Sequence, residues 1–244
     1  MLRGVADFTT TTVRSAKELP RAVWDAFEKS PQSANIMYAH AKQAAQYPST
    51  RQSENLWIVG WNMTHSRRKS PEVAFVLSCT THSLGKYPVF IFTPLSRNIL
   101  VDDFVRPRIL QIVRALREHA PPERVFSIFA LDVLTHLFAD LWTAETGVRL
   151  AANPVYYHSA LMYCDRSTFR SRELPLLPDA VITLRLAVDA DVKKTAALCR
   201  GFSETSVSFP TLPTSCQIIA DMYVTSARNH SYCLAATHFA RLSY

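Results

Sequence analysis

The chain has 244 residues, of which 48% are hydrophobic and 19% charged, so a largely disordered protein is excluded. This length fits one large or two small domains with real hydrophobic cores. The formal net charge of +7 favours anionic partners such as a coenzyme, a nucleic acid or an acidic surface, although a basic protein without such a partner fits equally well.

The glycines and cysteines of the sequence restrict the possible classes of function and the cellular compartment. Only five glycines occur, and none are spaced as G-x-G-x-x-G or as a P-loop, which disfavours Rossmann dinucleotide binding and P-loop nucleotide hydrolysis. Five scattered cysteines without a C-x-x-C motif indicate free thiols in a reducing compartment. Since no signal-peptide core or membrane-length apolar window is present, we expect a soluble, cytoplasmic protein.

The N-terminal part is expected to be helical after a short irregular segment. Residues 1–16 are polar and rich in threonine, which predicts a loose lead-in. Apolar residues at helical spacing predict a helix over 18–29, broken by Ser30 and Pro31. Ser33 could cap a second helix that ends near Pro48.

Three strands and a helix follow. Residues 56–61, 73–79 and 87–94 are strand-like with short connections, which indicates an antiparallel meander. Residues 87–94 are almost continuously apolar, as in a central strand that is buried on both faces. From Phe104 the spacing becomes helical up to Ala120, with Pro107 fitting the first turn.

Another strand, helix and strand complete this unit. Residues 124–131 are strand-like, Asp132 is expected to cap a helix, and Gly147 is expected to end it. Residues 156–164 are expected to form the last strand. The order of elements predicts one α/β (α+β) domain over residues 17–166.

A second, smaller unit is expected beyond a linker. Residues 167–180 are charged and then punctuated by prolines, which is typical of a linker. Residues 181–244 then provide a strand at 181–185, a helix from Asp189 or Asp191 that Gly201 ends, a helix at 214–227 and a strand at 232–237. At this length an independent core is marginal.

The order of elements in the first unit resembles the acyl-CoA N-acyltransferase (GNAT) fold. The segment Ile182-Thr183-Leu184-Arg185-Leu186-Ala187-Val188-Asp189-Ala190-Asp191-Val192 is similar to the opening strand and first helix of a GNAT domain. Together the units resemble fungal GNAT-like proteins with a divergent N-terminal lobe, over roughly residues 56–209. The resemblance implies a mixed, largely antiparallel sheet flanked by helices, followed by a partial GNAT-like unit with a truncated C-terminus.

The resemblance also implies a place for acetyl-CoA, where the fourth strand of that fold meets the following helix. The matching loop is residues 93–103, whose backbone N–H groups would cradle a phosphate. It contains no glycine, and Asp102 and Asp103 would repel phosphate. The cofactor-binding candidates are Leu95, Ser96, Arg97 and Asn98. The family often has a general-acid tyrosine on its late helix, and here Trp142 and Thr143 precede Gly147 instead.

Other candidate chemistry is weaker. Cys79 and His82 form the one close Cys/His pair, without the second pair that a zinc site needs, so no metal is expected. A Cys79 nucleophile would need a histidine nearby in space, and a buried, inert thiol is the simpler interpretation. Carboxylates that could act as a general base near strand ends, or equally be solvated charges or helix caps, are Glu54, Glu72 and Asp132.

Four arginines on the helix after residue 103 raise the possibility of nucleic-acid binding. No nucleic-acid motif accompanies them, and a solvated helix face is the preferred interpretation. They are Arg106, Arg108, Arg114 and Arg117.

Two functional hypotheses follow. The first is an N-acetyltransferase-type enzyme that transfers an acyl group from acyl-CoA to a small-molecule amine. The second is a catalytically inactive GNAT-like scaffold or regulatory module without a working coenzyme A site.

Overall fold

The computed structural model describes residues 8–46, 54–63, 70–82, 85–157, 167–170, 188–205 and 238–243. The chain divides into two compact units, Met1–Met162 with Ala235–Tyr244, and Tyr163–Leu234. This differs from the division expected from the sequence, because residues 235–244 belong to the first unit rather than to a unit spanning 181–244.

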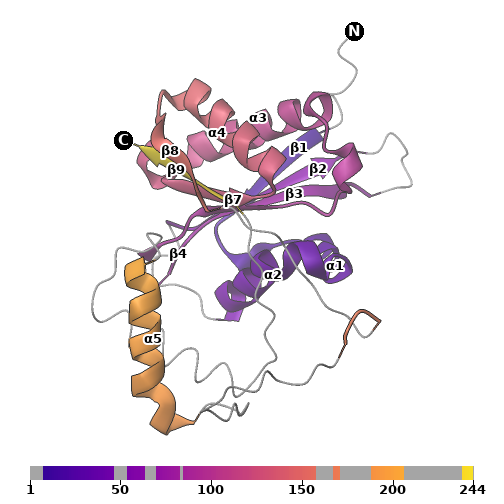
Figure 1. Ribbon diagram of the computed structural model, residues 1–244. Coiled ribbons are helices and arrows are strands. Elements are labelled where there is room, and N and C mark those ends of the chain that lie inside the picture. The colour runs from indigo at the N-terminus through magenta and orange to yellow at the C-terminus, as the bar shows by residue number, and fades with distance from the viewer. Residues whose placement is uncertain are drawn as a thin grey trace. The chain divides into compact units, whose positions relative to one another are not determined.

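The first unit contains a sheet of seven strands in the order β1-β2-β3-β6-β7-β9-β8 (Figure 1). All neighbouring strands are antiparallel except β6 and β7, which are parallel. The predicted α+β class with a mixed, largely antiparallel sheet is therefore confirmed. The strands are β1 (Phe8–Val13), β2 (Leu56–Asn62), β3 (Glu72–Cys79), β6 (Val89–Phe92), β7 (Ser127–Ala130), β8 (Arg149–Tyr157) and β9 (His238–Ser243). A separate two-stranded ribbon is formed by β4 (Thr81–His82) and β5 (Gly85–Lys86).

Helices cover both faces of this sheet (Figure 1). Before β2 the chain forms the 3₁₀ turn η1 (Ala16–Glu18), α1 (Arg21–Lys29) and α2 (Pro31–Gln46), which pack on one face. The other face is covered by α3 (Asp102–His119) and α4 (Asp132–Thr146). Short 3₁₀ turns η3 (Arg97–Ile99) and η4 (Pro122–Arg124) precede α3 and β7. The second unit contributes η5 (Asp189–Asp191) and α5 (Val192–Thr205).

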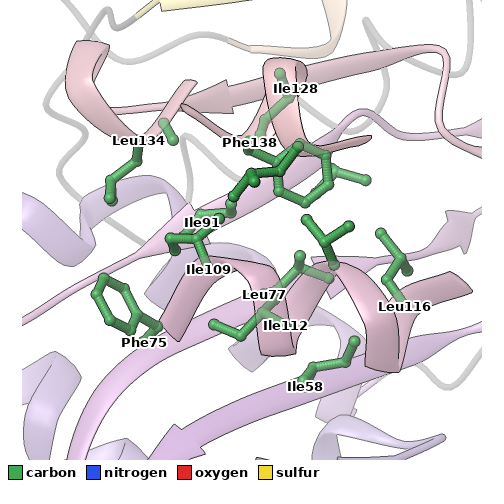
Figure 2. Close-up of a cluster of buried hydrophobic side chains, with 14 of the residues drawn as sticks. Ile58, Phe75, Leu77, Ile91, Ile109, Ile112, Leu116, Ile128, Leu134 and Phe138 are labelled. Carbon is green, nitrogen blue, oxygen red and sulfur yellow. The ribbon is translucent and has the colours of Figure 1, made fainter. Parts of the chain in front are cut away.

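The alternation of side chains along each central strand supplies both hydrophobic layers. Leu56 and Ile58 of β2 point toward α3 and α4, whereas Trp57 and Val59 point toward α1 and α2. Each of these four side chains is almost completely buried. Figure 2 shows side chains of the first layer that come from the sheet, α3 and α4: Ile58, Phe75, Leu77, Ile91, Ile109, Ile112, Leu116, Ile128, Leu134 and Phe138.

The predicted strand at 87–94 is confirmed as β6. Val89 and Ile91 belong to the layer under α3 and α4, and Phe92 belongs to the layer under α1 and α2. The predicted meander is also confirmed, because β2 pairs with β3 and β3 pairs with β6, both antiparallel.

The N-terminal segment differs from the expected loose lead-in over 1–16. Phe8–Val13 forms β1 and pairs along its whole length with β2, from Phe8 opposite Asn62 to Val13 opposite Trp57. The physical reason is the burial of Phe8 against Phe75, together with the preference of β-branched threonine for extended backbone.

Several helix boundaries also differ from expectation. Pro31 opens α2 in place of a cap at Ser33, and α3 begins at Asp102, which places Pro107 in the second turn. In the second unit α5 continues through Gly201 to Thr205. Gly147 does end α4, with a left-handed φ of 76°, as predicted.

The C-terminal strands depart most from the expectation. Of the last strand expected at 156–164, residues 158–164 lie outside the described residues. The described part is the end of β8, which begins at Arg149. It pairs with β9, which lies between β7 and β8 although residues 158–237 separate it from β8 in sequence. The elements expected at 181–185, 214–227 and 232–237, and most of the linker at 167–180, lie outside the described residues. Among the helices that the structure describes, none is long and apolar enough to cross a bilayer.

A close approach at Gly60 makes a stability prediction. A Cβ at this position would lie 2.5 Å from Cζ of Phe8, and the backbone around Gly60 and Trp61 already shifts register. We expect Gly60→Ala to destabilise the protein by about 1–3 kcal/mol, as overpacking does.

The measurement is urea unfolding of Gly60→Ala, Phe8→Leu and the double variant. If the Phe8 ring causes the clash, the double variant loses less free energy of unfolding than the two single variants lose in sum. Additive effects would contradict this explanation.

Candidate functional site

The C-terminal ends of β6 and β7 form the edge at which a ligand is expected. Strand β6 is the fourth strand of the main sheet along the chain, and it leads into α3 as β7 leads into α4. The parallel ladder between them has only two residue pairs, Val89 with Ile128 and Phe90 with Phe129. In sheets with parallel strands, ligands usually bind beyond the carboxyl ends, next to the N-termini of the following helices.

The loop from β6 to α3 contains all four predicted cofactor-binding residues. Ser96, Arg97 and Asn98 are exposed on the 3₁₀ turn, while Leu95 is half-buried against the core under α3. Arg97 and Asn98 thus lie in the 3₁₀ turn, Ser96 is its N-cap, and Leu95 comes just before it. The structure does not place any other predicted site residue within that turn.

The loop uses several of its own N–H groups. The amides of Ile99, Leu100 and Val101 donate to carbonyl oxygens of Ser96, Arg97 and Ile99 at 2.8–3.1 Å. In the described part of the chain, the amides of Ser96, Arg97 and Asn98 have no such partner. The turn can offer an anion these three amides, the Arg97 guanidinium, and the side-chain donors of Ser96 and Asn98.

The first turn of α3 opposes an anion. Asp102 and Asp103 are exposed there, and Arg106 donates two hydrogen bonds to Asp102 at 2.7 and 2.9 Å. These hydrogen bonds, followed by the charge of Arg106, lower the pKa of Asp102. An ionised carboxylate therefore occupies the positive end of the helix dipole, where it stabilises α3 and repels phosphate.

The other arginines of α3 are held by neighbouring groups. Arg108 is buried, donates to Asn62 Oδ1 at 3.1 Å, and lies 3.8 Å from the centre of the Phe104 ring. The prediction that Arg108 lies on a solvated helix face is therefore wrong. Arg114 and Arg117 both donate to the Glu145 carboxylate, at 3.0 and 3.1 Å. The helix thus does not present four uncompensated cations to a nucleic acid.

A second polar group lies at the opposite edge of the sheet, where β3 ends and β6 and β7 begin. His40 Nε2 is 2.8 Å from Thr80 Oγ1, and the imidazole packs against Trp57, Tyr87 and Phe90. A histidine beside a hydroxyl is the geometry of a base and a nucleophile. Because Thr80 is 0% exposed, a substrate cannot reach it, and the pair is structural.

Arg124 ties this edge together. Its guanidinium is buried and donates to the carbonyl oxygens of Thr80, which immediately follows β3, and Tyr87, which lies shortly before β6. Its Nε has no partner among the described residues. Sequence reasoning missed both His40 and Arg124, because an isolated polar residue in an apolar segment gives no signal of which distant groups it meets.

The remaining candidates show no catalytic arrangement. Cys79 is free and buried, as predicted, and burial raises its pKa while Arg124, Lys86 and Arg14 oppose that rise. The possible bases are exposed on separate elements: Glu54, Glu72 and Asp132. No group of three or more metal-ligating side chains occurs in the described ranges.

The Arg124 contacts make a prediction about stability. We expect Arg124→Lys to destabilise the protein by about 1.5–3 kcal/mol, because a lysine cannot reproduce the fork that reaches two carbonyl groups. Arg117→Lys is the matched control on an exposed ion pair, with an expected cost of at most about 1 kcal/mol. If chemical denaturation shows that both variants lose the same free energy of unfolding, the buried hydrogen bonds of Arg124 do not have this role.

The Asp102–Arg106 pair makes a prediction about pH. The Asp102 carboxyl should titrate below its ordinary value of 3.8, and Arg106→Ala should move its midpoint back up. Because the folded-state pKa is the lower one, the pair stabilises the protein above pH 3.8 and this contribution is lost as the pH falls through the folded-state pKa. Carboxyl ¹³C shifts in an NMR titration measure both midpoints, and coincident midpoints would contradict the assignment.

Comparison with known proteins gives no relative from which a function could be inferred. No family model matches the chain, and neither a curated protein nor a solved structure matches it.

Proposed function

We propose that this chain is a GNAT-like N-acyltransferase that transfers an acyl group from acyl-CoA, such as acetyl-CoA, to a small-molecule amine. One observation carries the proposal. The fourth strand of a mixed sheet ends beside a parallel neighbour with which it shares only two residue pairs, and a loop with one 3₁₀ turn then connects it to α3. The fold class and the order of its elements agree with the resemblance to the GNAT fold.

In this proposal the turn at Leu95, Ser96, Arg97 and Asn98 receives the phosphates of the acyl-CoA. Arg97 contributes a charged donor, and the amides of Ser96 to Asn98 contribute neutral ones. The amine nitrogen attacks the thioester carbonyl carbon, the C–S bond breaks, and the coenzyme leaves as a thiolate that takes up the proton lost by the amine. Donors at the strand ends would stabilise the oxyanion of the tetrahedral intermediate.

A second candidate, a GNAT-like scaffold or regulatory module without catalysis, is favoured by the acidic first turn of α3. The ionised Asp102 and its neighbour Asp103 lie in the first turn of α3, at the helix end where this proposal puts a phosphate. Each pair of like unit charges 4 Å apart costs about 1 kcal/mol in water, and more at a protein surface. Two such carboxylates can weaken phosphate binding by tenfold or more.

The proposal includes the acyl acceptor and the cellular location of the protein. The acceptor is a small-molecule amine, and nucleic acid is disfavoured because the α3 arginines are held by Asp102, Asn62 and Glu145. We place the protein in the cytoplasm, where the Cys79 thiol stays reduced.

Isothermal titration with acetyl-CoA separates the two candidates. For the enzyme, we expect the purified chain to bind, Arg97→Ala to weaken binding about tenfold, and Asp102→Asn/Asp103→Asn to tighten it about tenfold through the charges that each change removes. The matched control is Glu118→Gln/Glu123→Gln, which removes two exposed carboxylates near the other end of α3.

The outcomes are distinct. No heat at millimolar acetyl-CoA with either the native chain or the Asp102/Asp103 double variant sinks the enzyme proposal and leaves the scaffold. If only the double variant binds, the fold contains a coenzyme-binding site, and the native carboxylates of Asp102 and Asp103 prevent the coenzyme from binding there. If the control variant binds acetyl-CoA equally more tightly, the gain in affinity comes from the net charge of the protein and not from the position of Asp102 and Asp103.

A further inference from the structure

We propose that Thr93 is a positioning residue for the acyl-CoA loop, which it holds to the sheet through its side-chain hydroxyl; this rests on the proposed function. Thr93 lies immediately after β6 and is only 4% exposed. It does not belong to the turn that offers donors to a ligand. Its effect on a ligand is therefore indirect, through the direction in which the chain leaves β6.

Proline at position 94 creates the need for this hydroxyl. Strand β3 pairs with β6 through Val76–Phe92, Leu77–Ile91 and Ser78–Phe90. If this register continued, Ala74 would lie opposite Pro94, which has no N–H to donate. The ladder must stop there, and the Ala74 carbonyl, on a residue that is 0% exposed, would be left without a donor.

The Thr93 side chain replaces the missing backbone donor. Its Oγ1 donates to the Ala74 carbonyl oxygen at 2.8 Å and accepts from the Leu95 N–H at 3.1 Å. A single hydroxyl thus links β3 to the first residue of the loop beyond the proline. Among the described residues, these are the last hydrogen bonds that connect the loop to the sheet before the 3₁₀ turn at Arg97–Ile99.

The link determines where the turn presents its donors. Because Leu95 is held from both sides, by Thr93 and by its apolar contact with the core, the following amides start from a fixed point. Without the hydroxyl, the Leu95 N–H and the buried Ala74 carbonyl both lose their partner. The loop then gains freedom, and an anion must order it on binding.

The test uses Thr93→Val, which removes the hydroxyl at similar size, and Thr93→Ser, which restores it. The matched control is Thr135→Val on α4, because Thr135 is also buried but its hydroxyl has no partner in the described part of the chain. Two readouts are taken on each protein: hydrogen exchange of the amides from Leu95 to Val101, and the dissociation constant for acetyl-CoA by isothermal titration.

We expect Thr93→Val to speed exchange of the Leu95 amide at least tenfold and to weaken acetyl-CoA binding several-fold. Thr93→Ser should restore both, and Thr135→Val should change neither. Unchanged exchange in Thr93→Val overturns the inference whatever the ligand result. So does faster exchange with unchanged affinity, since the loop would then not position the ligand.

Failure of the proposed function is recognised separately. If the native chain does not bind acetyl-CoA while Thr93→Val still loosens the loop and Thr93→Ser restores it, the enzyme proposal fails. The role of Thr93 in holding the loop then stands, without a coenzyme to position.

Discussion

Burial of the central strands on both faces is the constraint on which the rest of the structure depends. In β2, β3 and β6 nearly every side chain lies in one of two hydrophobic layers, so a helix must cover each face of the sheet. The chain meets this need in sequence order, with α1 and α2 packing on one face and α3 and α4 on the other. Gly60 shows how tight the first layer is, because the Phe8 ring occupies the space of its absent side chain.

A sheet covered on both faces leaves its two edges of strand ends for polar chemistry, and these edges differ in this protein. Where β6 and β7 begin, Arg124 and His40 are buried. Arg124 donates to the carbonyl oxygens of Thr80 and Tyr87, and His40 is hydrogen-bonded to the Thr80 hydroxyl. Where the same strands end, an exposed turn presents amides and Arg97 to solvent. Among the described residues, the first edge is therefore closed around buried side chains, whereas the second carries an exposed turn.

Electrostatics at the accessible edge do not follow the net charge of the chain. The protein carries a formal charge of +7, yet the α3 N-terminus displays two carboxylates, and Arg106 is paired with one of them. Three further arginines of α3 are held by Asn62 and Glu145. The basic composition therefore says little about this edge, and the balance between Arg97 and the aspartates is the local property that decides whether a phosphate can bind.

Local sequence signals were enough to predict the buried strand β6, the meander of β2, β3 and β6, the helices, and the end of α4 at Gly147. The resemblance to the GNAT fold, rather than a local signal, pointed to residues 95–98 as cofactor-binding candidates. Three features appeared only in the folded chain: Phe8–Val13 is an edge strand, β9 lies between β7 and β8, and the hydroxyl of Thr93 replaces the missing donor of Pro94. The reason is that periodicity reports which face of an element is apolar, whereas strand partners and buried hydrogen bonds are chosen between residues far apart in the chain.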